Sequence, residues 1–261
     1  NKCQKSHKLI FMKTKLYFCK KFSFMKFVKN TVLFFLTFSL FIQCKKEIQP
    51  ETKSGVKNEI TYAKGLEIYK YEGYTIVKIT KPWPGAKENF IYVLQEKNGI
   101  IPDSLTQLTI VPIPLQSIVV TSTTHIPALE MLGVENTLVG FPNTDYISSE
   151  KTRKLIDVGK VREVGTNETL NTEVLIDMAP DLIVSFGLNN NNPTIDNLQK
   201  SGLKVIYNGD WTEQSPLGKA EWIKFFGALY GLDNKANTIF KEIEKEYTNT
   251  LALVKKATSK P

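Results

Sequence analysis

The period of hydrophobic and polar positions changes near residue 118, and this change divides the chain into two patterns. Before it, three runs rich in Tyr, Ile and Val lie at residues 66–71, 74–80 and 89–95. Runs of this kind, separated by a turn such as Glu72-Gly73, are typical of antiparallel strands. We therefore predict a β-rich lead-in over residues 60–110 that packs on the rest of the domain.

Residues 118–140, IVVTSTTHIPALEMLGVENTLVG, join a β-branched run to a helical pattern. The run IVVT suits a buried strand, and the hydroxyl residues at 121–124 suit a helix N-cap. Pro127 fits the first turn of a helix that Gly133 ends. Apolar positions recur at helical spacing at Ile126, Leu129 and Leu132. A loop and a helix N-terminus thus follow the carboxyl end of a strand, where open α/β sheets usually bind ligands.

The alternation of strands and helices continues along the chain. Further strands are predicted at residues 138–141, 156–158, 182–186 and 204–207, and helices at 148–155, after an Asn171 cap, at 194–200 and from Pro216 to Gly231. Asp233 caps a last helix over residues 234–256, roughly 35 Å long at 1.5 Å per residue. Its apolar face is Ala236, Ile239, Phe240, Ile243, Tyr247, Leu251 and Val254. Short connections imply right-handed crossovers and a parallel sheet, hence an α/β, Rossmann-like fold.

The charge of the chain is unevenly distributed. The net charge of +8 arises because residues 1–44 hold nine lysines and no acidic residue. The remaining residues carry 25 basic and 26 acidic side chains, so their charges nearly cancel. This balance gives no support to nucleic-acid binding.

The N-terminal residues are typical of a bacterial lipoprotein signal. A basic segment at 25–29 precedes an apolar run at 31–42, which is too short to span a bilayer comfortably. Cys44 follows and is the predicted lipidation site, although Gln43 replaces the usual small residue. We predict that residues 1–24 are an upstream or non-native extension, with a genuine extension as the alternative. Residues 25–44 are then the signal peptide, and the polar residues 45–59 a tether to the membrane.

Residues 118–256 resemble the class III periplasmic substrate-binding proteins, which are ABC-importer receptors for iron-siderophores, haem and cobalamin. Met131–Gly133 with residues 138–140 is similar to the family's "ALG…LVG" pattern, and residues 164–184 to "VG…NLEAILALKPDLVI". Residues 198–206 resemble "LxxxGIPVV", and residues 225–240 resemble the entry to the family's inter-lobe helix. Four such segments occur in the family's order.

The resemblance implies a non-enzymatic lipoprotein that captures an iron-siderophore or related chelate and delivers it to an ABC permease. It implies no cofactor, a membrane contact through the lipid anchor, and a periplasmic or cell-surface location. The family has two lobes joined by a long helix. We expect a ligand-binding lobe at 60–232, a truncated inter-lobe helix at 233–261 and a missing second lobe. The alternatives are a cobalamin or haem receptor, or a truncated chain without competent ligand binding.

In this family, the loops at the carboxyl ends of the strands face the ligand cleft. The resemblance implies that these loops are here residues 121–125, 142–146, 166–169, 186–192 and 210–213. The candidate ligand-binding residues here are Thr123, Thr124, His125, Asn143, Tyr146, Phe186 and Trp211. For the threonines simple capping is equally plausible, and a lone histidine beside a cap is more often structural. Thr144 and Asn167 stand where cobalamin receptors carry aromatics, which weakens cobalamin as the ligand. Glu173 matches the family's first-lobe glutamate, which pairs with permease arginines.

Several further residues have a structural interpretation that we favour. Trp83 is predicted to lie in the core, with a place in a ligand site as the alternative. The 189–192 loop is predicted to be surface, and the basic side chains Lys151, Arg153 and Arg162 to form a solvated face.

Other function classes fit the sequence poorly. It contains no GxSxG, GxGxxG, P-loop or HExxH motif. His125 is the only histidine after the predicted signal, and no cysteine follows Cys44. Triads, zinc sites and the several histidines of zinc or manganese receptors are therefore hard to build. A structural lipoprotein with a vestigial ligand site is the remaining alternative.

Overall fold

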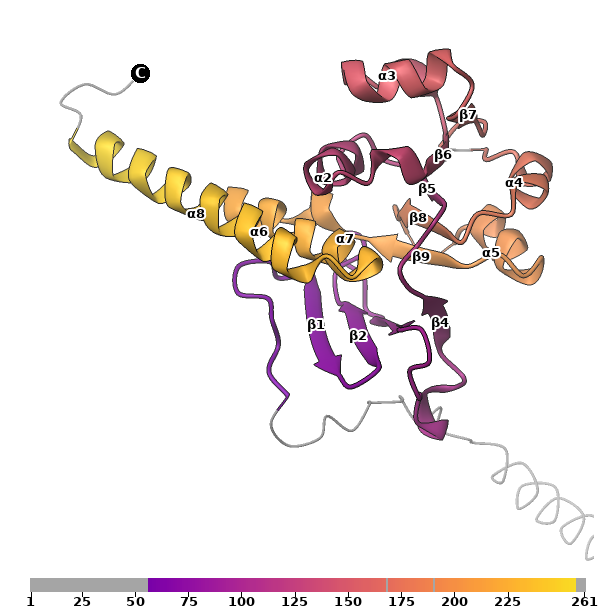
Figure 1. Cartoon of the computed structure of the whole chain (residues 1–261), viewed down its shortest axis with the longest axis horizontal. Coiled ribbons are helices and arrows are strands. Elements are labelled where there is room, and N and C mark those ends of the chain that lie inside the picture. Colours follow the sequence, from indigo (N-terminus) through magenta and orange to yellow (C-terminus); the bar gives the residue numbers. More distant parts are fainter. Residues whose placement is uncertain (1–55, 168, 190, 257–261) are drawn as a thin grey trace, which may run out of the picture. The chain divides into compact units, whose positions relative to one another are not determined.

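A computed structural model describes residues 56–167, 169–189 and 191–256, and these residues form two β-sheets with associated helices (Figure 1). The lead-in sheet has the order β1 (Leu66–Tyr71), β2 (Tyr74–Ile79), β3 (Phe90–Gln95) and β4 (Thr109–Pro112). The first three strands are antiparallel, as predicted. β4, for which no strand was predicted, pairs parallel with β3. The segment between them, which includes η2 (Asp103–Leu105), is long enough to return the chain for parallel pairing.

The second sheet is wholly parallel, as predicted from the short connections. Its order is β7 (Arg162–Glu163), β6 (Leu138–Phe141), β5 (Ile118–Val120), β8 (Leu182–Phe186) and β9 (Val205–Asn208). The helices between these strands are α2 (His125–Leu132), α3 (Glu150–Asp157), α4 (Thr172–Met178) and α5 (Pro193–Lys200). Short 3-10 turns η3 (Glu135–Thr137), η4 (Thr144–Tyr146) and η5 (Asp210–Thr212) follow α2, β6 and β9. The predicted α/β fold class is therefore confirmed.

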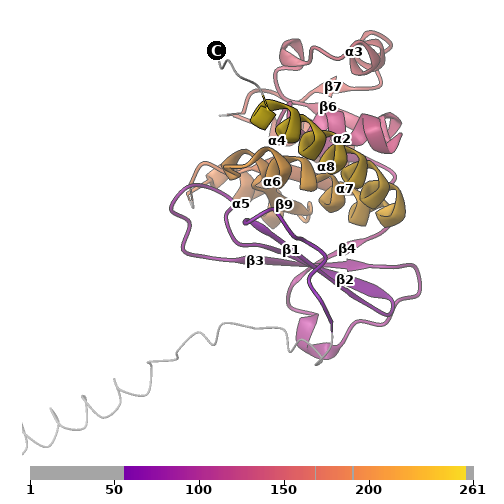
Figure 2. The same ribbon diagram turned by 90° about the vertical axis from the view of Figure 1, so that its left-hand side faces the viewer.

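Both faces of the parallel sheet are covered, and alternate residues of the central strand enter different cores. Ile118 and Val120 belong to a cluster that includes residues of α2, α7 (Ile223–Tyr230) and α8 (Asp233–Lys256). Val119 belongs to a cluster with residues of α4 and α5. In both views α7 and α8 lie between α2 and the lead-in sheet (Figures 1 and 2). Burial on both faces explains why β5 reads as a continuous apolar run.

Three local predictions are wrong. The expected strand at 156–158 is instead the end of α3, where Leu155 and Ile156 pack on the core from a helix. The predicted single helix from Pro216 is two, α6 (Pro216–Glu221) and α7, which meet at Trp222. Thr124 occupies the N-cap of α2, but its backbone is already helical and its side chain makes no capping hydrogen bond.

Other helix boundaries follow the predicted signals. Gly133 ends α2 with φ of 71°, a left-handed conformation in which a side chain is strained. Asn171 caps α4, because its Oδ1 accepts a hydrogen bond from the Val174 amide at 3.1 Å.

The lead-in is tied to the parallel sheet at the edge of β9. The amide of Tyr207, on β9, donates to the hydroxyl of Tyr92, on β3, at 3.0 Å. The ring of Phe90 lies 4.9 Å from that of Tyr207. An edge strand exposes unpaired backbone groups, and here the lead-in covers part of that edge.

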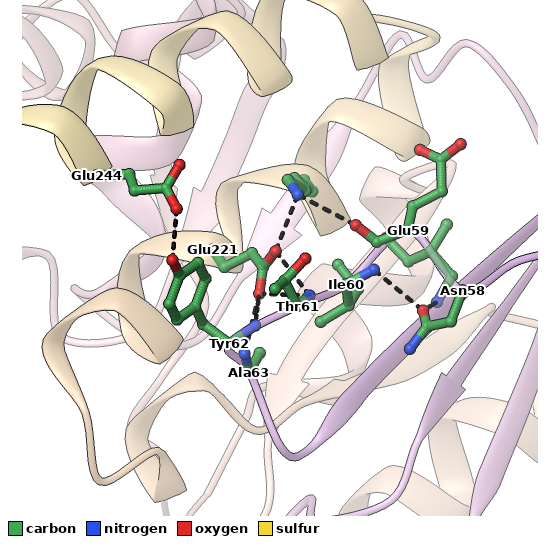
Figure 3. Close-up of polar contacts among 10 residues, drawn as sticks. Asn58, Glu59, Ile60, Thr61, Tyr62, Ala63, Glu221 and Glu244 are labelled. Carbon is green, nitrogen blue, oxygen red and sulfur yellow. Dashed lines mark hydrogen bonds and ion pairs between the residues drawn. The ribbon is translucent and has the colours of Figure 1, made fainter.

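A second tie joins the start of the lead-in to α6 through the buried carboxylate of Glu221 (Figure 3). This carboxylate accepts hydrogen bonds from the amides of Thr61, Tyr62 and Ala63 at 2.6–3.1 Å. Lys224 donates to it at 2.8 Å. The hydroxyl of Tyr62 donates to Glu244 on α8. The lead-in therefore contacts both α6 and α8 through polar groups that are far away in sequence.

Helix α8 is as long as predicted, but its expected apolar face is only partly buried. Ala236 and Phe240 are buried, whereas Leu251 and Val254 are exposed. Figure 1 shows the last turns of α8 extending beyond α6 and α7. Within the part of the chain that the structure describes, no helix is long and apolar enough to cross a membrane.

Candidate functional site

A groove of about 200 Å³ lies at the carboxyl end of β8, where the loop after β8 faces the loop after β7. Its lining is Thr121, Asn167, Leu170, Ser185, Phe186, Leu188, Asn189, Asn191, Asn192, Pro193, Thr194 and Ile195. This is the edge at which open parallel sheets bind ligands. We take it as the candidate ligand site.

The floor of the groove is held by hydrogen bonds between neighbouring strands. The Thr121 amide donates to the Val184 carbonyl at 3.1 Å, and the Thr121 hydroxyl accepts from the Phe186 amide at 3.1 Å. Thr121 is 2% exposed, so this pair of bonds joins the ends of β5 and β8 away from water. Phe186 is thereby fixed at the rim, half-buried, as part of the lining.

The outer wall comes from the loop that leads into α5. Asn192 caps this helix, since its Oδ1 accepts from the Ile195 amide at 3.1 Å, and Pro193 occupies the first turn. The Asn189 side chain accepts from the Asn191 amide at 2.9 Å. The lining therefore combines amide and hydroxyl groups with the apolar side chains of Phe186 and Leu188. Such a surface suits an uncharged polar ligand group beside an apolar one.

The predicted ligand-binding residues occupy different environments. Only Phe186 among them lines the groove. Thr123 and Thr124 are exposed in the loop after β5, and Tyr146 is 70% exposed. Asn143 is half-buried with φ of 50°, and Trp211 is 36% exposed. These five remain candidates for a wider ligand-binding surface.

His125 lies in the core instead of on the surface. Its side chain is 0% exposed and its ring centroid is 5.5 Å from that of Phe226. Burial lowers the pKa of His125, while the charge of Asp210 and the side chain of Asn208 act in the opposite direction. Neither ring nitrogen has a hydrogen-bond partner among the described residues. This environment favours the structural interpretation of His125.

Three further assignments can be compared with the structure. Trp83 is 6% exposed and packs edge-on against Phe90 and Tyr207, in agreement with the favoured core position. Glu173 is exposed in the first turn of α4, where a carboxylate suits the helix dipole. The basic side chains Lys151 and Arg162 pair with Glu135 and Asp177.

Some groove residues were not among the predicted ligand contacts. Ser185 belongs to the end of β8. Thr121 and the asparagines at 189, 191 and 192 belong to loops that were expected to face the cleft, although a surface position was favoured for residues 189–192. A signal did exist, because four asparagines at 189–192, two residues after a buried strand, place amides at the carboxyl edge of the sheet. The described residues contain no group of three His, Cys, Asp or Glu side chains that could hold a metal ion. Cys44 and the predicted signal lie outside the described residues.

Comparison with known proteins gives the following matches. A family model described as "Periplasmic binding protein" matches residues 118–261, more than half of the chain. An uncharacterized lipoprotein of Methanocaldococcus jannaschii is 29% identical over 226 residues, which cover 83% of this chain and 54% of that protein. A second uncharacterized lipoprotein of that organism is 22% identical over 232 residues, which cover 81% of this chain and 55% of that protein.

A solved ABC transporter substrate-binding protein from Listeria monocytogenes EGD-e is 20% identical, with a TM-score of 0.41. The match covers 56% of this chain and 52% of that chain. The chain spans about half the length of the curated lipoproteins that it matches.

Proposed function

The chain belongs to the periplasmic binding protein family, and from this premise we propose that it is the substrate-binding lipoprotein of an ABC importer. It captures an iron-siderophore or a related iron chelate and delivers it to a membrane permease. The observation that carries this proposal is the groove at the carboxyl end of β8 inside the region that matches the family. The names of the two archaeal relatives, both lipoproteins, support attachment to a membrane through Cys44.

The groove supports a binding function through its chemistry. Phe186 offers an aromatic face at the rim, and Thr121, Asn167 and Asn189 offer hydrogen-bonding groups around it. An organic chelate presents both apolar surface and ligand oxygens, so it can use both kinds of contact. Cobalamin is less favoured, because Thr144 is buried and donates to Glu163 at 3.0 Å instead of presenting an aromatic ring.

Intrinsic fluorescence offers a direct binding assay. Trp83 and Trp222 are buried, and Trp211 is 36% exposed beside the loop after β9, so Trp211 is placed to report binding at this edge. The purified chain is titrated with a ferric tris-hydroxamate, a ferric tris-catecholate, hemin and cobalamin. We expect saturable quenching by a ferric chelate, and a chelate of the same class in native mass spectra of protein purified from cells.

Two variants make the assay specific for the groove. Phe186→Ala removes the aromatic rim and is expected to weaken binding about tenfold or more, as losing about 1.4 kcal/mol of contact does. Tyr247→Ala removes a half-buried aromatic of α8 that lies outside the groove lining and is not a candidate ligand contact, so it serves as the matched control. Tight binding of cobalamin or hemin in place of ferric chelates overturns the ligand assignment. No binding by any of the four supports the alternative of a chain without competent ligand binding.

A further inference from the structure

The lead-in contributes a short segment, residues 81–84, that packs against both loops at the ligand edge of the parallel sheet. Gly187 directly follows β8, and Gly209 directly follows β9. A Cβ built on Gly187 would lie 2.4 Å from Cε3 of Trp83, and one built on Gly209 would lie 2.3 Å from the carbonyl oxygen of Lys81. Both distances are far too short for real carbon contacts, so the lead-in touches the backbone itself at these two places.

The contact at Gly187 reaches the groove directly. Gly187 stands between Phe186 and Leu188, and both of these side chains line the groove. The Trp83 ring is held edge-on against Tyr207 at 5.4 Å and against Phe90 at 5.6 Å. Trp83 also belongs to the same core cluster as Leu170 and Ile195, which line the groove as well. The buried Trp83 ring therefore packs against Gly187, between two residues that line the groove, and shares a core cluster with two others.

The contact at Gly209 fixes the neighbouring loop. The Lys81 carbonyl accepts a hydrogen bond from the Thr212 hydroxyl at 3.1 Å. The buried carboxylate of Glu213 accepts from the amides of Lys64 and Gly65 at 2.8 Å. The loop that carries Trp211 is thus held by backbone groups of the lead-in on two sides.

We propose that residues 81–84 position the two loops that follow β8 and β9, with Trp83 as a positioning residue for the ligand groove. The predicted effect of Trp83 on ligand affinity rests on the proposed function, whereas its predicted effect on the two loops does not. The lead-in then helps to form the wall of the ligand groove in addition to packing on the rest of the domain. A change in Trp83 alters the groove without touching a lining residue.

A double-mutant cycle on the full chain tests the positioning role without any ligand. Gly187→Ala places a methyl group against Trp83, and Trp83→Leu removes the ring edge that it meets. We expect Gly187→Ala alone to raise amide hydrogen exchange in residues 184–195 about tenfold, which corresponds to about 1.4 kcal/mol of local opening. In the Trp83→Leu background the same change should add much less, because the two contacts with the Trp83 ring are gone and only Cδ1 of Tyr207, at 3.3 Å, remains close.

Gly227→Ala is the matched control. Its Cβ would lie 2.5 Å from the Cβ of Ala236, a comparable clash between α7 and α8. We expect it to raise exchange in residues 223–240 and to leave 184–195 unchanged. The positioning role is overturned if Gly187→Ala raises exchange equally in both backgrounds, or if the control loosens residues 184–195 to the same extent. If Gly187→Ala fails to fold, Trp83→Phe tests the same loop with a smaller loss of contact.

A binding experiment distinguishes failure of this positioning proposal from failure of the proposed function. The probe is the ferric complex of acetohydroxamate, and its binding is followed by isothermal titration calorimetry, which does not depend on the tryptophan that Trp83→Leu removes. If the unmodified chain binds it, Trp83→Leu should weaken binding about tenfold while Gly227→Ala leaves binding unchanged. Unchanged affinity in Trp83→Leu overturns the role in binding. If the unmodified chain does not bind the probe, capture of this chelate is refuted, and the exchange experiment still decides whether Trp83 positions the loops.

Discussion

Replacing Glu221 by Gln tests whether the lead-in is held to the lobe by one buried carboxylate. Glu221 is 0% exposed and accepts from three backbone amides and from Lys224, whose side chain is 13% exposed (Figure 3). Glutamine keeps one acceptor oxygen but turns an NH₂ group toward donors, and it leaves Lys224 without its charge partner. Removing one partner of a buried ion pair costs about 3–5 kcal/mol.

The lower end of that range applies here because one acceptor oxygen remains. A loss of about 3 kcal/mol is a large part of a typical stability of about 5–15 kcal/mol. At about 2–4 °C per kcal/mol for a domain of this size, the Tm should fall by roughly 6–12 °C. Urea unfolding followed by circular dichroism measures the free energy directly. Glu242→Gln, at an exposed position on α8, is the control and should stay within about 0.5 kcal/mol.

The pH dependence of the free energy of unfolding is a second, independent test of the role of Glu221. Burial by itself raises the pKa of Glu221, but hydrogen bonds from Lys224 and from the amides of Ala63, Thr61 and Tyr62 outweigh it and hold the pKa below 4.5. The stabilisation is therefore present above about pH 4.5 and is lost as the pH falls through the lowered pKa. Glu221→Gln should remove that acid-side loss. A variant that loses less than about 1 kcal/mol and keeps the parent's acid profile would refute the reasoning.

Three further outcomes are expected. Asn171→Ala removes the side-chain cap of α4 and should lower the free energy of unfolding by about 1 kcal/mol, with Asn197→Ala, at an exposed position on α5, as the control. Burial lowers the pKa of His125 from 6.5, so the unfolded chain takes up the proton first and stability should fall as the pH drops below about 6.5. His125→Gln should flatten urea-unfolding profiles in that window, and an unchanged slope would contradict the assignment. Glu173→Arg in the intact receptor should reduce uptake and leave ligand binding unchanged; loss of binding would count against a docking role.

Elements with strong local signals were predictable from the sequence. The strands β1, β2 and β3 and the parallel strands β5, β6, β8 and β9 lie within a residue or two of their predicted positions. Each has β-branched or aromatic residues bounded by turn or cap signals. The misplaced strand at 156–158 was a run of three residues. A run so short fits the end of a helix as well as a strand, and packing of Leu155 and Ile156 on the core decided between them.

The candidate site was less predictable than the fold. The loops at the carboxyl edge of the sheet could be predicted because loop positions follow from strand order. Which side chains share a groove depends on how the loops fold back. The buried position of His125 is an example, since it depends on the approach of Phe226, which is distant in sequence.

The sequence alone determined most of the strands and helices, the parallel sheet and the family, because these depend on local periodicity and on segments in a fixed order. The tertiary structure decided which residues of the lead-in contact the loops after β8 and β9. Trp83 read as an ordinary core residue, but its ring meets the backbone at Gly187, and the Lys81 carbonyl meets the backbone at Gly209. Contacts of this kind join residues more than 100 positions apart through close packing of backbone and ring, so no local pattern encodes them. For the same reason, only the folded chain shows that Thr121, Phe186 and the asparagines after β8 face one groove.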